Sequence, residues 1–333
     1  MTTFTLLVLV VIFALIFDFV NGFHDTANAI ATVVSTGAMR ARNAILLAAV
    51  CNILGALMGT AVAKTLGKDI LDPALVTQTL VLSALLGAIV WNLFTWYFGI
   101  PSSSSHALVG GMIGAGLVAE GAHAIKAEGV EKVVTALIVS PLFGFTFAFA
   151  AMIAWMWIIR RRPPGTVNRL FRVLQLPSAA FLAVSHGLND AQKTMGVITV
   201  ALVSYDGTFD ASGEFPVPLW VVIACAVAMG LGTASGGWRI IHTMGNKIFK
   251  MEPIHGFTSS VVAAGVIQGA SWFGLPISTT HCITMSIMGA GATKRLSAVR
   301  WGVTRKIVIA WIVTIPASGL VAALCYVVFD AIL

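Results

Sequence analysis

Long apolar segments run along almost the whole chain and are separated only by short polar breaks. They lie near 4–36, 43–66, 75–98, 105–119 and 132–159, and again near 174–204, 217–241, 254–273, 280–292 and 303–329. A helix needs about 20 apolar residues to cross a bilayer, and most of these segments reach that length. Hydrophobic residues make up 58% of the chain and charged residues only 10%, which leaves too little polar surface for a soluble fold. The sequence therefore predicts an all-α polytopic membrane protein, embedded in the lipid bilayer of the cell membrane.

The charges in the polar breaks predict how the chain is oriented. Acidic residues exceed basic ones in 119–132 and 205–215. Basic residues dominate four other breaks, at 40–42, 160–172, 239–250 and 294–306. Because positively charged loops stay in the cytoplasm, one arrangement satisfies all of these breaks, with both termini outside and an odd number of crossings in each half. The halves then insert in opposite orientations. The same loops account for the net charge of +7 without a nucleic-acid partner.

An internal repeat supports this arrangement. Two stretches align without gaps: "GIPSSSSHALVGGMIGAG" (99–116) with "GLPISTTHCITMSIMGAG" (274–291), and "GFHDTANA" (22–29) with "GLNDAQKT" (187–194). The second alignment pairs Asp25 with Asp190. Two matches in the same order predict two inverted-topology repeats of transmembrane helices. The predicted units are residues 1–159 and 173–333, joined by a cytoplasmic basic linker at 160–172.

Each half also contains a helix break that carries no charge. Gly99 and Pro101 interrupt the first half, and Gly274 and Pro276 interrupt the second. A break at the membrane surface could easily carry charge, so its absence favours a re-entrant helical hairpin whose tip is buried in the protein. Two full crossings in place of each hairpin would give the same loop charges and stay an alternative. The tips would present the hydroxyls of Ser102, Ser103, Ser104 and Ser105 and of Ser278, Thr279 and Thr280.

Asp25, Asp190 and Lys193 are charged side chains within the apolar segments. Each charge held mid-membrane costs roughly 2.5 to 3.5 kcal/mol on the insertion scale, so a purely structural ion pair is the less favoured interpretation. Short hydroxyls and helix N-termini supply donors from several directions, which suits a tetrahedral oxyanion. Aspartates would repel that anion unless a cation or a proton accompanied it. The pattern therefore indicates symport through a site near the midplane.

Four stretches together carry a family resemblance. They read "NGFHDTANAIATVVSTGAM", "GIPSSSSHALVGG", "SHGLNDAQKTMGVIT" and "GLPISTTHCITMSIMGAG". In this order they resemble the duplicated signatures of the inorganic phosphate transporter (Pit) family, over nearly the whole chain. The resemblance implies a secondary active transporter for inorganic phosphate that works by alternating access, and neither an enzyme nor a protein with a cofactor. The candidate substrate-binding residues are Asp25, Asn28, Ser103, Ser104, Ser105, Asn189, Asp190, Gln192, Lys193, Ser278, Thr279 and Thr280.

Departures from the usual family signature bear on the coupling ion. That signature has Asn-Asp with a following Ala-Asn in both halves. This chain instead has His24-Asp25 with Asn28 in the first half, and Asn189-Asp190 with Gln192-Lys193 in the second. The departures resemble the bacterial low-affinity, proton-coupled branch rather than the sodium-coupled one. That branch is thought to move phosphate with a divalent metal as a neutral complex, so divalent ions are candidate partners alongside phosphate and protons.

Lys193 is the departure with the clearest physical meaning, because it aligns with Asn28. An amide oxygen can help to coordinate sodium, whereas an ammonium group has no acceptor and repels a cation. Asp190, three residues earlier on the same helical face, is its expected partner. We therefore expect coupling through protons. The candidate coupling residues are Asp25, Asp190, Lys193 and His24, the last because histidine titrates near neutral pH and suits proton handling or metal contact.

Other functions stay open at this point. A sodium-coupled phosphate or sulfate symporter, or an oxyanion channel, would share the same hairpins. A hydrolase built on Ser105 and His106 is disfavoured, because adjacent residues point to different faces of a helix and the repeat duplicates the stretch. His106 and His281 are equally compatible with core packing. A homo-oligomer is compatible with the sequence, which leaves the oligomeric state open.

Overall fold

The computed structural model describes residues 2–72, 75–207 and 215–332, and these are mostly helical. The first half contains α1 (Thr3–Ser35), α2 (Ala41–Ala56), α3 (Ala61–Asp69), α4 (Gln78–Tyr97), α5 (Ser104–Ala119) and α6 (Ala127–Ile159). The second half contains α7 (Pro164–Asp206), α8 (Leu219–Ser235), α9 (Trp238–His242), α10 (Pro253–Trp272), α11 (Thr279–Ala292) and α12 (Trp301–Ile332). Most of the acidic break predicted at 205–215 lies outside the described residues.

The two halves contain the same succession of helices. Each starts with a long helix that carries a polar stretch (α1, α7), continues with a bent pair (α2 and α3, α8 and α9), forms a hairpin (α4–α5, α10–α11) and ends with a long helix (α6, α12). The packing repeats as well, since α1 packs on α8 as α7 packs on α2, and α5 packs on α12 as α11 packs on α6. The core is therefore built from contacts exchanged between the halves. Their opposite orientation across a membrane stays a prediction.

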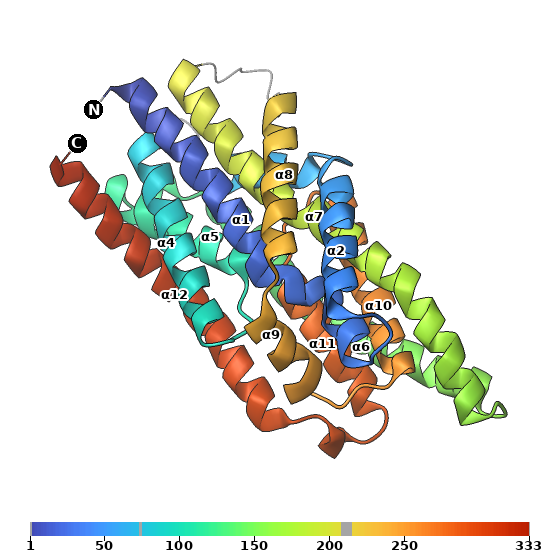
Figure 1. Cartoon of the computed structure of the whole chain (residues 1–333). Helices are drawn as coiled ribbons and strands as arrows, with labels where there is room; N and C mark the ends of the chain where they lie inside the picture. Colours follow the sequence, from blue (N-terminus) through green and yellow to red (C-terminus); the bar gives the residue numbers. More distant parts are fainter. Residues whose placement is uncertain (1, 73–74, 208–214, 333) are drawn as a thin grey trace.

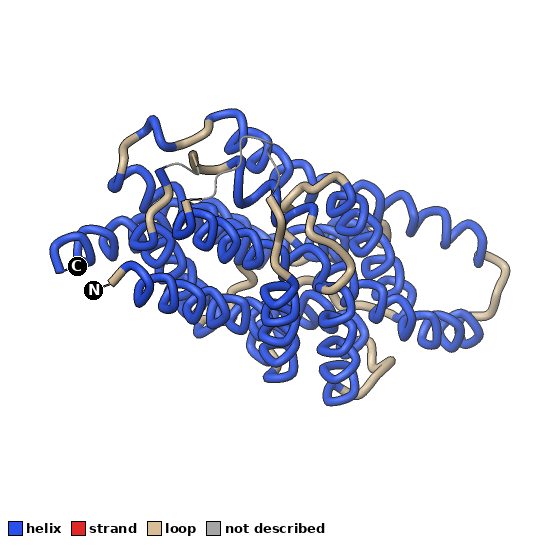
Figure 2. The backbone as a smooth tube through the Cα atoms, turned by 90° about the horizontal axis from the view of Figure 1, so that it is seen from above, coloured by secondary structure: helices blue, strands red, loops and turns tan. Residues whose placement is uncertain are grey.

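The ends of the helices separate into two groups along the bundle. Figure 1 shows the N-terminus, the C-terminus and the yellow end of α7 together at the upper end, with the turn between α6 and α7 and the start of α12 at the lower end. In Figure 2 the connection between α6 and α7 extends beyond the other helices, as it does in Figure 1. The basic breaks at 160–172 and 294–306 thus share one end, away from the termini, as the predicted orientation requires.

Four of the described helices have the length and composition of membrane spans. Among the described residues, α1, α4, α6 and α12 are long and apolar enough to cross a membrane, and the count rises from four to six if each bent pair is one span. Their outward faces carry exposed apolar side chains such as Phe147 on α6 and Ile312 and Leu320 on α12. Such faces are stable in hydrocarbon and not in water. The chain is a multi-pass membrane protein.

The apolar segments 43–66 and 217–241 are bent, which the sequence analysis did not predict. Helices α2 and α3 meet at 70°, and α8 meets α9 and the following turn at 61°. At the second bend Gly236 has φ +73°, a left-handed conformation that favours glycine. At Gly237 an added Cβ would lie 2.4 Å from Phe23 O on α1, so the bend also brings this segment close to α1. Hydropathy alone did not detect these bends, because each bent pair taken together is apolar enough to be one span.

The connection between the halves is shorter than the predicted linker at 160–172. Helix α6 ends at Ile159 and α7 begins at Pro164, so only 160–163 separate the two helices. Proline is favoured at the first position of a helix, because its ring fixes φ and its missing N–H would have had no partner there. Pro164 therefore starts a helix in a stretch whose prolines and arginines suggested an irregular linker.

The two uncharged breaks form tight connections within the hairpins. Gly99 and Gly274 have φ values of +63° and +66°, and each turns the chain from one helix into the next. Ser103 and Ser278 then cap α5 and α11, each accepting a bond of 3.2 Å from the backbone N–H of the histidine three residues later. The tips contact one another, because Ser105 Oγ on α5 donates to Ile277 O at 3.1 Å. Entry of the hairpins from opposite sides of a membrane stays a prediction.

Glycines bring α2 and α7 into backbone contact. An added Cβ at Gly187 would lie 2.1 Å from Asn52 O, and one at Gly55 would lie 2.0 Å from Val184 O. Both distances are far below a normal carbon–oxygen contact, so the two helices can approach this closely only without side chains at these positions. The close packing fixes the position of α7, and with it that of the polar stretch on α7.

We expect Gly187→Ala to lower the thermal stability of the protein in detergent by several degrees. The new methyl group would have to push α7 away from α2, and overpacking of this kind costs about 1 to 3 kcal/mol. Gly165→Ala is the matched control in the same helix, because no atom lies within 4 Å of a Cβ at that position. Thermal unfolding of both variants measures the difference. Equal melting temperatures for wild type and Gly187→Ala would contradict the close contact.

Candidate functional site

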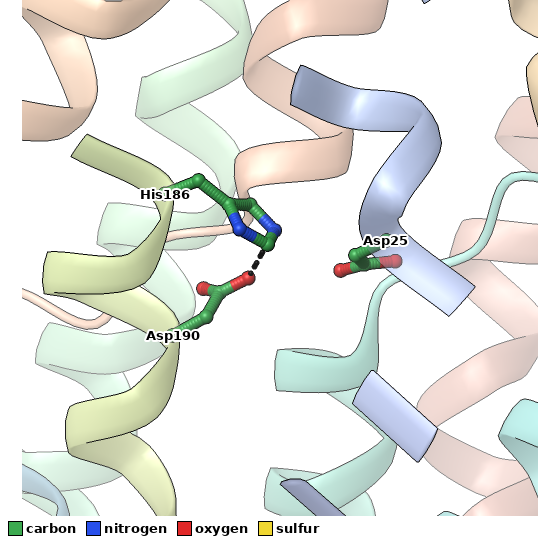
Figure 3. Close-up of side chains that lie close together, drawn as sticks. All are labelled: Asp25, His186 and Asp190. Carbon is green, nitrogen blue, oxygen red and sulfur yellow. Dashed lines mark ion pairs between the residues drawn. The ribbon is translucent and has the colours of Figure 1, made fainter. Parts of the chain in front are cut away.

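The polar stretches of α1 and α7 face each other inside the bundle. Figure 3 shows Asp25 of α1 opposite His186 and Asp190 of α7, with the three side chains directed toward one another. All three are buried, with Asp25 at 2% and Asp190 at 0% exposure. The two aspartates that the repeat aligns therefore belong to one constellation.

Asp25 accepts hydrogen bonds from hydroxyl groups of both hairpins. Ser104 Oγ at the tip of α4–α5 donates to Asp25 Oδ2 at 3.1 Å, and Thr280 Oγ1 at the tip of α10–α11 donates to the same oxygen at 3.4 Å. His24 Nδ1 lies 2.6 Å from Asp25 Oδ1, and His24 Nε2 lies 3.1 Å from Thr95 Oγ1 on α4. The carboxylate of Asp25 is thus held between two hairpin tips and a histidine, away from water.

Asp190 and Lys193 form a buried ion pair one turn apart on α7, as their spacing predicts. Lys193 Nζ also donates to Ser105 Oγ at 2.5 Å and to Ile277 O at 2.9 Å, so the ammonium contacts both hairpin tips. Thr279 Oγ1 donates to the second oxygen of Asp190 at 2.9 Å. The ammonium and the hydroxyl together compensate a carboxylate that would otherwise be costly to bury.

Asn28 makes the contact that corresponds to the one made by Lys193. Asn28 Nδ2 donates to Thr280 Oγ1 at 2.8 Å, whereas Lys193 Nζ donates to Ser105 Oγ, and the repeat aligns both the donors and the acceptors. The internal symmetry of the sequence therefore extends to side-chain contacts. The two contacts differ in charge, because the donor is the neutral amide of Asn28 in the first half and the ammonium group of Lys193 in the second.

Four of the predicted binding residues make bonds that hold helix ends. Ser103 and Ser278 cap α5 and α11. Asn189 Nδ2 donates to Ser271 Oγ at 2.9 Å and so ties α7 to α10. Gln192 Oε1 accepts from Val62 N at 2.7 Å, close to the start of α3. Asn189 and Gln192 therefore bond to neighbouring helices rather than to Asp25 or Asp190.

His186 and Asn21 join the constellation although the sequence analysis did not include them in the candidate set. His186 Nε2 lies 3.1 Å from Asp190 Oδ2, and Asn21 Oδ1 accepts from Ser104 Oγ at 2.6 Å. Each residue precedes its aspartate by four positions, so it lies on the same helical face, and the repeat aligns the two. That spacing is the signal that would have identified them.

The side chains of Asp25, His186 and Asp190 can supply ligands for a metal ion. One ligand atom from each lies within 4.8 Å of the others. Carboxylate oxygen and imidazole nitrogen together suit several divalent ions. Lys193 is paired with Oδ1 of Asp190, whereas His186 faces Oδ2, so a metal bound between His186 and the aspartates would share Asp190 with the ammonium group.

Four amide atoms of residues near the aspartates in the sequence have no hydrogen-bond partner among the described residues. They are two donors, Asn21 Nδ2 and Gln192 Nε2, and two acceptors, Asn28 Oδ1 and Asn189 Oδ1. Buried polar atoms are nearly always bonded, so these atoms are free to bond to a polar ligand. The donors and acceptors around the two aspartates can therefore accommodate an anion together with a cationic partner.

The geometry does not support a hydrolase. The Ser105 hydroxyl bonds to Lys193 and to a backbone oxygen, and no histidine is among its partners. The ring centroids of His106 and His281 lie 4.4 Å apart, and His281 stacks on Trp311 at 3.8 Å. The two histidines therefore pack against each other between α5 and α11, as core residues do.

Comparisons with known proteins agree with one another. The profile of the phosphate transporter family matches residues 21–166 and, a second time, residues 160–322. A protein of Rhizobium meliloti (strain 1021) named probable low-affinity inorganic phosphate transporter is 49% identical over 332 residues, which cover 99% of this chain and 98% of that protein. A protein of the same name from Bacillus subtilis (strain 168) is 47% identical over 329 residues, which cover 98% of each chain.

A solved structure is also similar over its full length. It is called the sodium-dependent phosphate transporter, and it superposes with a TM-score of 0.90 at 26% identity, covering 99% of this chain and 100% of that chain.

Proposed function

The chain belongs to the phosphate transporter family, and on that premise we propose that it imports inorganic phosphate across the cell membrane by proton symport. The observation that carries the proposal is the convergence of hydroxyls from both hairpin tips on the carboxylates of α1 and α7. A site built from both halves can change its exposure when one half moves relative to the other, which is the geometry of alternating access.

The proposed phosphate site lies between the hairpin tips, Asp25 and Lys193. Hydroxyls and the N-termini of α5 and α11 supply donors, and Lys193 supplies a positive charge. When phosphate binds, the hydroxyls that now donate to Asp25 and Asp190 would turn toward it. The proposed binding set keeps the residues named from the sequence, with Ser103, Ser278, Asn189 and Gln192 as orienting groups.

The inverted repeat is part of the proposal. We propose residues 1–159 and 173–333 as the two moving units, with the basic stretch 160–172, which contains the connection 160–163 and the start of α7, on the cytoplasmic side. The repeated succession of helices and the two separate matches to the family profile support this division.

Protons are the proposed coupling ion because Lys193 occupies the position that aligns with Asn28. The ammonium group fills a place where an amide oxygen could otherwise help to bind sodium, and it cannot act as a ligand itself. The similar solved structure is named as sodium-dependent, so the proposed difference in coupling is tied to this position. His24, in contact with Asp25, is a proposed relay for the proton.

A divalent metal is a second candidate cargo, carried as a neutral complex with phosphate. The cluster of Asp25, His186 and Asp190 favours it, because these residues offer a metal one nitrogen and two carboxylates. Uptake of a labelled divalent ion in fixed ratio with phosphate would support this cargo. Phosphate uptake that continues unchanged in the presence of a chelator would exclude it.

The central test is uptake of labelled phosphate by the purified protein in proteoliposomes. We expect an inward proton gradient to drive accumulation in nominally sodium-free buffer, because the site holds its own cation in Lys193. An inward sodium gradient at equal pH on both sides should add nothing. Strict dependence on sodium would show a sodium symporter, and equilibration without accumulation under either gradient would show a channel. Competition by sulfate at equal concentration would measure selectivity.

A further inference from the structure

Asp18 is a buried carboxyl group that the proposed site does not use. It lies on α1 and is 0% exposed, and neither of its oxygens has a hydrogen-bond partner among the described residues. It precedes Asp25 by seven residues, which places it on the same helical face about 10 Å away. The position that the repeat aligns with Asp18 is Ala183, so the second half has no counterpart.

The groups that face Asp18 come from α7 and α8. The Thr194 hydroxyl of α7 and the Cys225 thiol of α8 are polar neighbours of Asp18, and the charges of Asp190 and Lys193 on α7 also act on it. The Thr194 hydroxyl also lacks a hydrogen-bond partner among the described residues. Helix α8 has no other ionisable residue, and α4, which also packs on α1, has only Tyr97 at its last position.

These surroundings favour a neutral carboxyl group. An ionised carboxylate without a partner in an apolar interior is far more costly than the neutral acid, so a group in this position takes up a proton instead. The one nearby positive charge does not remove the cost, because Lys193 is already paired with Asp190. A cation such as sodium would need several oxygen ligands, whereas the neighbours here offer one hydroxyl and one thiol.

We propose that Asp18 is the residue that carries the coupled proton. This inference rests on the proposed proton symport and adds the site at which the proton is bound. Asp18 lies on the N-terminal side of Asp25, which the loop charges place toward the outside. In the outward-facing state its carboxylate binds one proton from the outside water. The neutral acid then allows the loaded protein to close, and the proton leaves to the cytoplasm when the inward-facing state admits water.

The test separates phosphate movement from proton movement. Purified full-length protein is reconstituted, and two rates are measured: exchange of labelled for unlabelled phosphate at equal pH, and accumulation driven by a more acidic outside. Asparagine mimics the neutral acid, so we expect Asp18→Asn to keep exchange close to the wild-type rate and to lose accumulation. Asp18→Glu should retain accumulation. Asp206→Asn is the matched control, because it removes an exposed carboxylate at the end of α7, and it should retain both activities.

Each other outcome also decides the question. Accumulation by Asp18→Asn at the wild-type level would overturn the assignment, and so would loss of exchange in a variant that still elutes as folded protein on gel filtration. If Asp18→Asn does not fold, the pH profile of accumulation by Asp18→Glu decides, since a shifted profile supports the assignment and an unchanged one overturns it. A wild type that does not accumulate phosphate under a proton gradient would instead overturn the proposed symport itself.

Discussion

Lys193→Asn should abolish proton-driven phosphate uptake. The ammonium group is 1% exposed, and it contacts Asp190, the Ser105 hydroxyl and the Ile277 carbonyl. Removing one partner of a buried ion pair leaves an uncompensated charge at a cost of about 3 to 5 kcal/mol, which corresponds to a loss of about a hundred-fold or more. Uptake of labelled phosphate into proteoliposomes in sodium-free buffer measures the loss.

An exposed ion pair provides the matched control for this variant. Lys132 Nζ lies 3.3 Å from Asp69 Oδ2, and the two side chains are 46% and 35% exposed. Exposed pairs contribute about 0 to 1 kcal/mol, so Lys132→Asn should transport normally. Proton-driven uptake by Lys193→Asn at the wild-type rate would contradict the role of the ammonium group.

A double variant separates a functional lysine from one that only balances charge. If Lys193 serves only to neutralise Asp190, removing both charges in Lys193→Asn/Asp190→Asn should restore uptake. We expect that the double variant does not recover uptake, because Asp190 also accepts a hydrogen bond from Thr279 and lies beside His186 in the same constellation. A sodium-dependent uptake gained by Lys193→Asn would further indicate that the lysine occupies a cation position.

Ser104→Ala and Thr279→Ala should each weaken the apparent affinity for phosphate by about ten-fold or more, because a lost donor to a charged group in a dry site costs about 1.5 to 3 kcal/mol. Ser104 Oγ now donates to Asn21 and Asp25, and Thr279 Oγ1 donates to Asp190. The two hydroxyls are aligned by the repeat, so the effects should be similar in size. The dependence of the uptake rate on phosphate concentration measures these changes in apparent affinity.

Ser83→Ala is the control for the loss of a buried hydroxyl as such. Ser83 lies on α4 of the same hairpin, and its Oγ donates back to Thr79 O one turn earlier. This variant should keep the wild-type affinity, and all three variants should yield similar amounts of folded protein. Unchanged affinity for phosphate in both Ser104→Ala and Thr279→Ala would show that the hairpin tips do not bind phosphate.

The sequence predicted those features that depend on local spacing. Asp190 and Lys193 are three residues apart, and helix geometry alone makes them neighbours, as the structure shows. The uncharged glycine–proline breaks likewise predicted the two hairpins, because a glycine that can adopt a left-handed conformation followed by a proline favours a turn, whereas the isolated prolines Pro141, Pro177 and Pro316 lie inside helices. The duplicated stretches predicted that these parts occur twice. Each of these inferences needs only the chain near the residue in question.

Contacts between distant segments could not be read from the sequence. Asp18 lies in an apolar run, and only the packing of α7 and α8 on α1 shows that its carboxyl oxygens have no hydrogen-bond partner within the described part of the chain. Asn189 and Gln192 stand beside the aspartate in the sequence, yet each bonds to another helix. Spacing along a helix gives the face on which a side chain lies, but not the group that it meets there.

The sequence by itself determined that this protein is helical, lies in a membrane and has a duplicated polar site, because hydropathy and repeats are properties of the chain. The tertiary structure alone decided which groups from other helices surround each aspartate. Lys193 reaches both hairpin tips and balances Asp190, whereas Asp25 is held by hydroxyls and His24 without an ammonium group. The physical reason is that the electrostatic balance of a buried charge depends on every group around it, and those groups come from segments far apart in the chain.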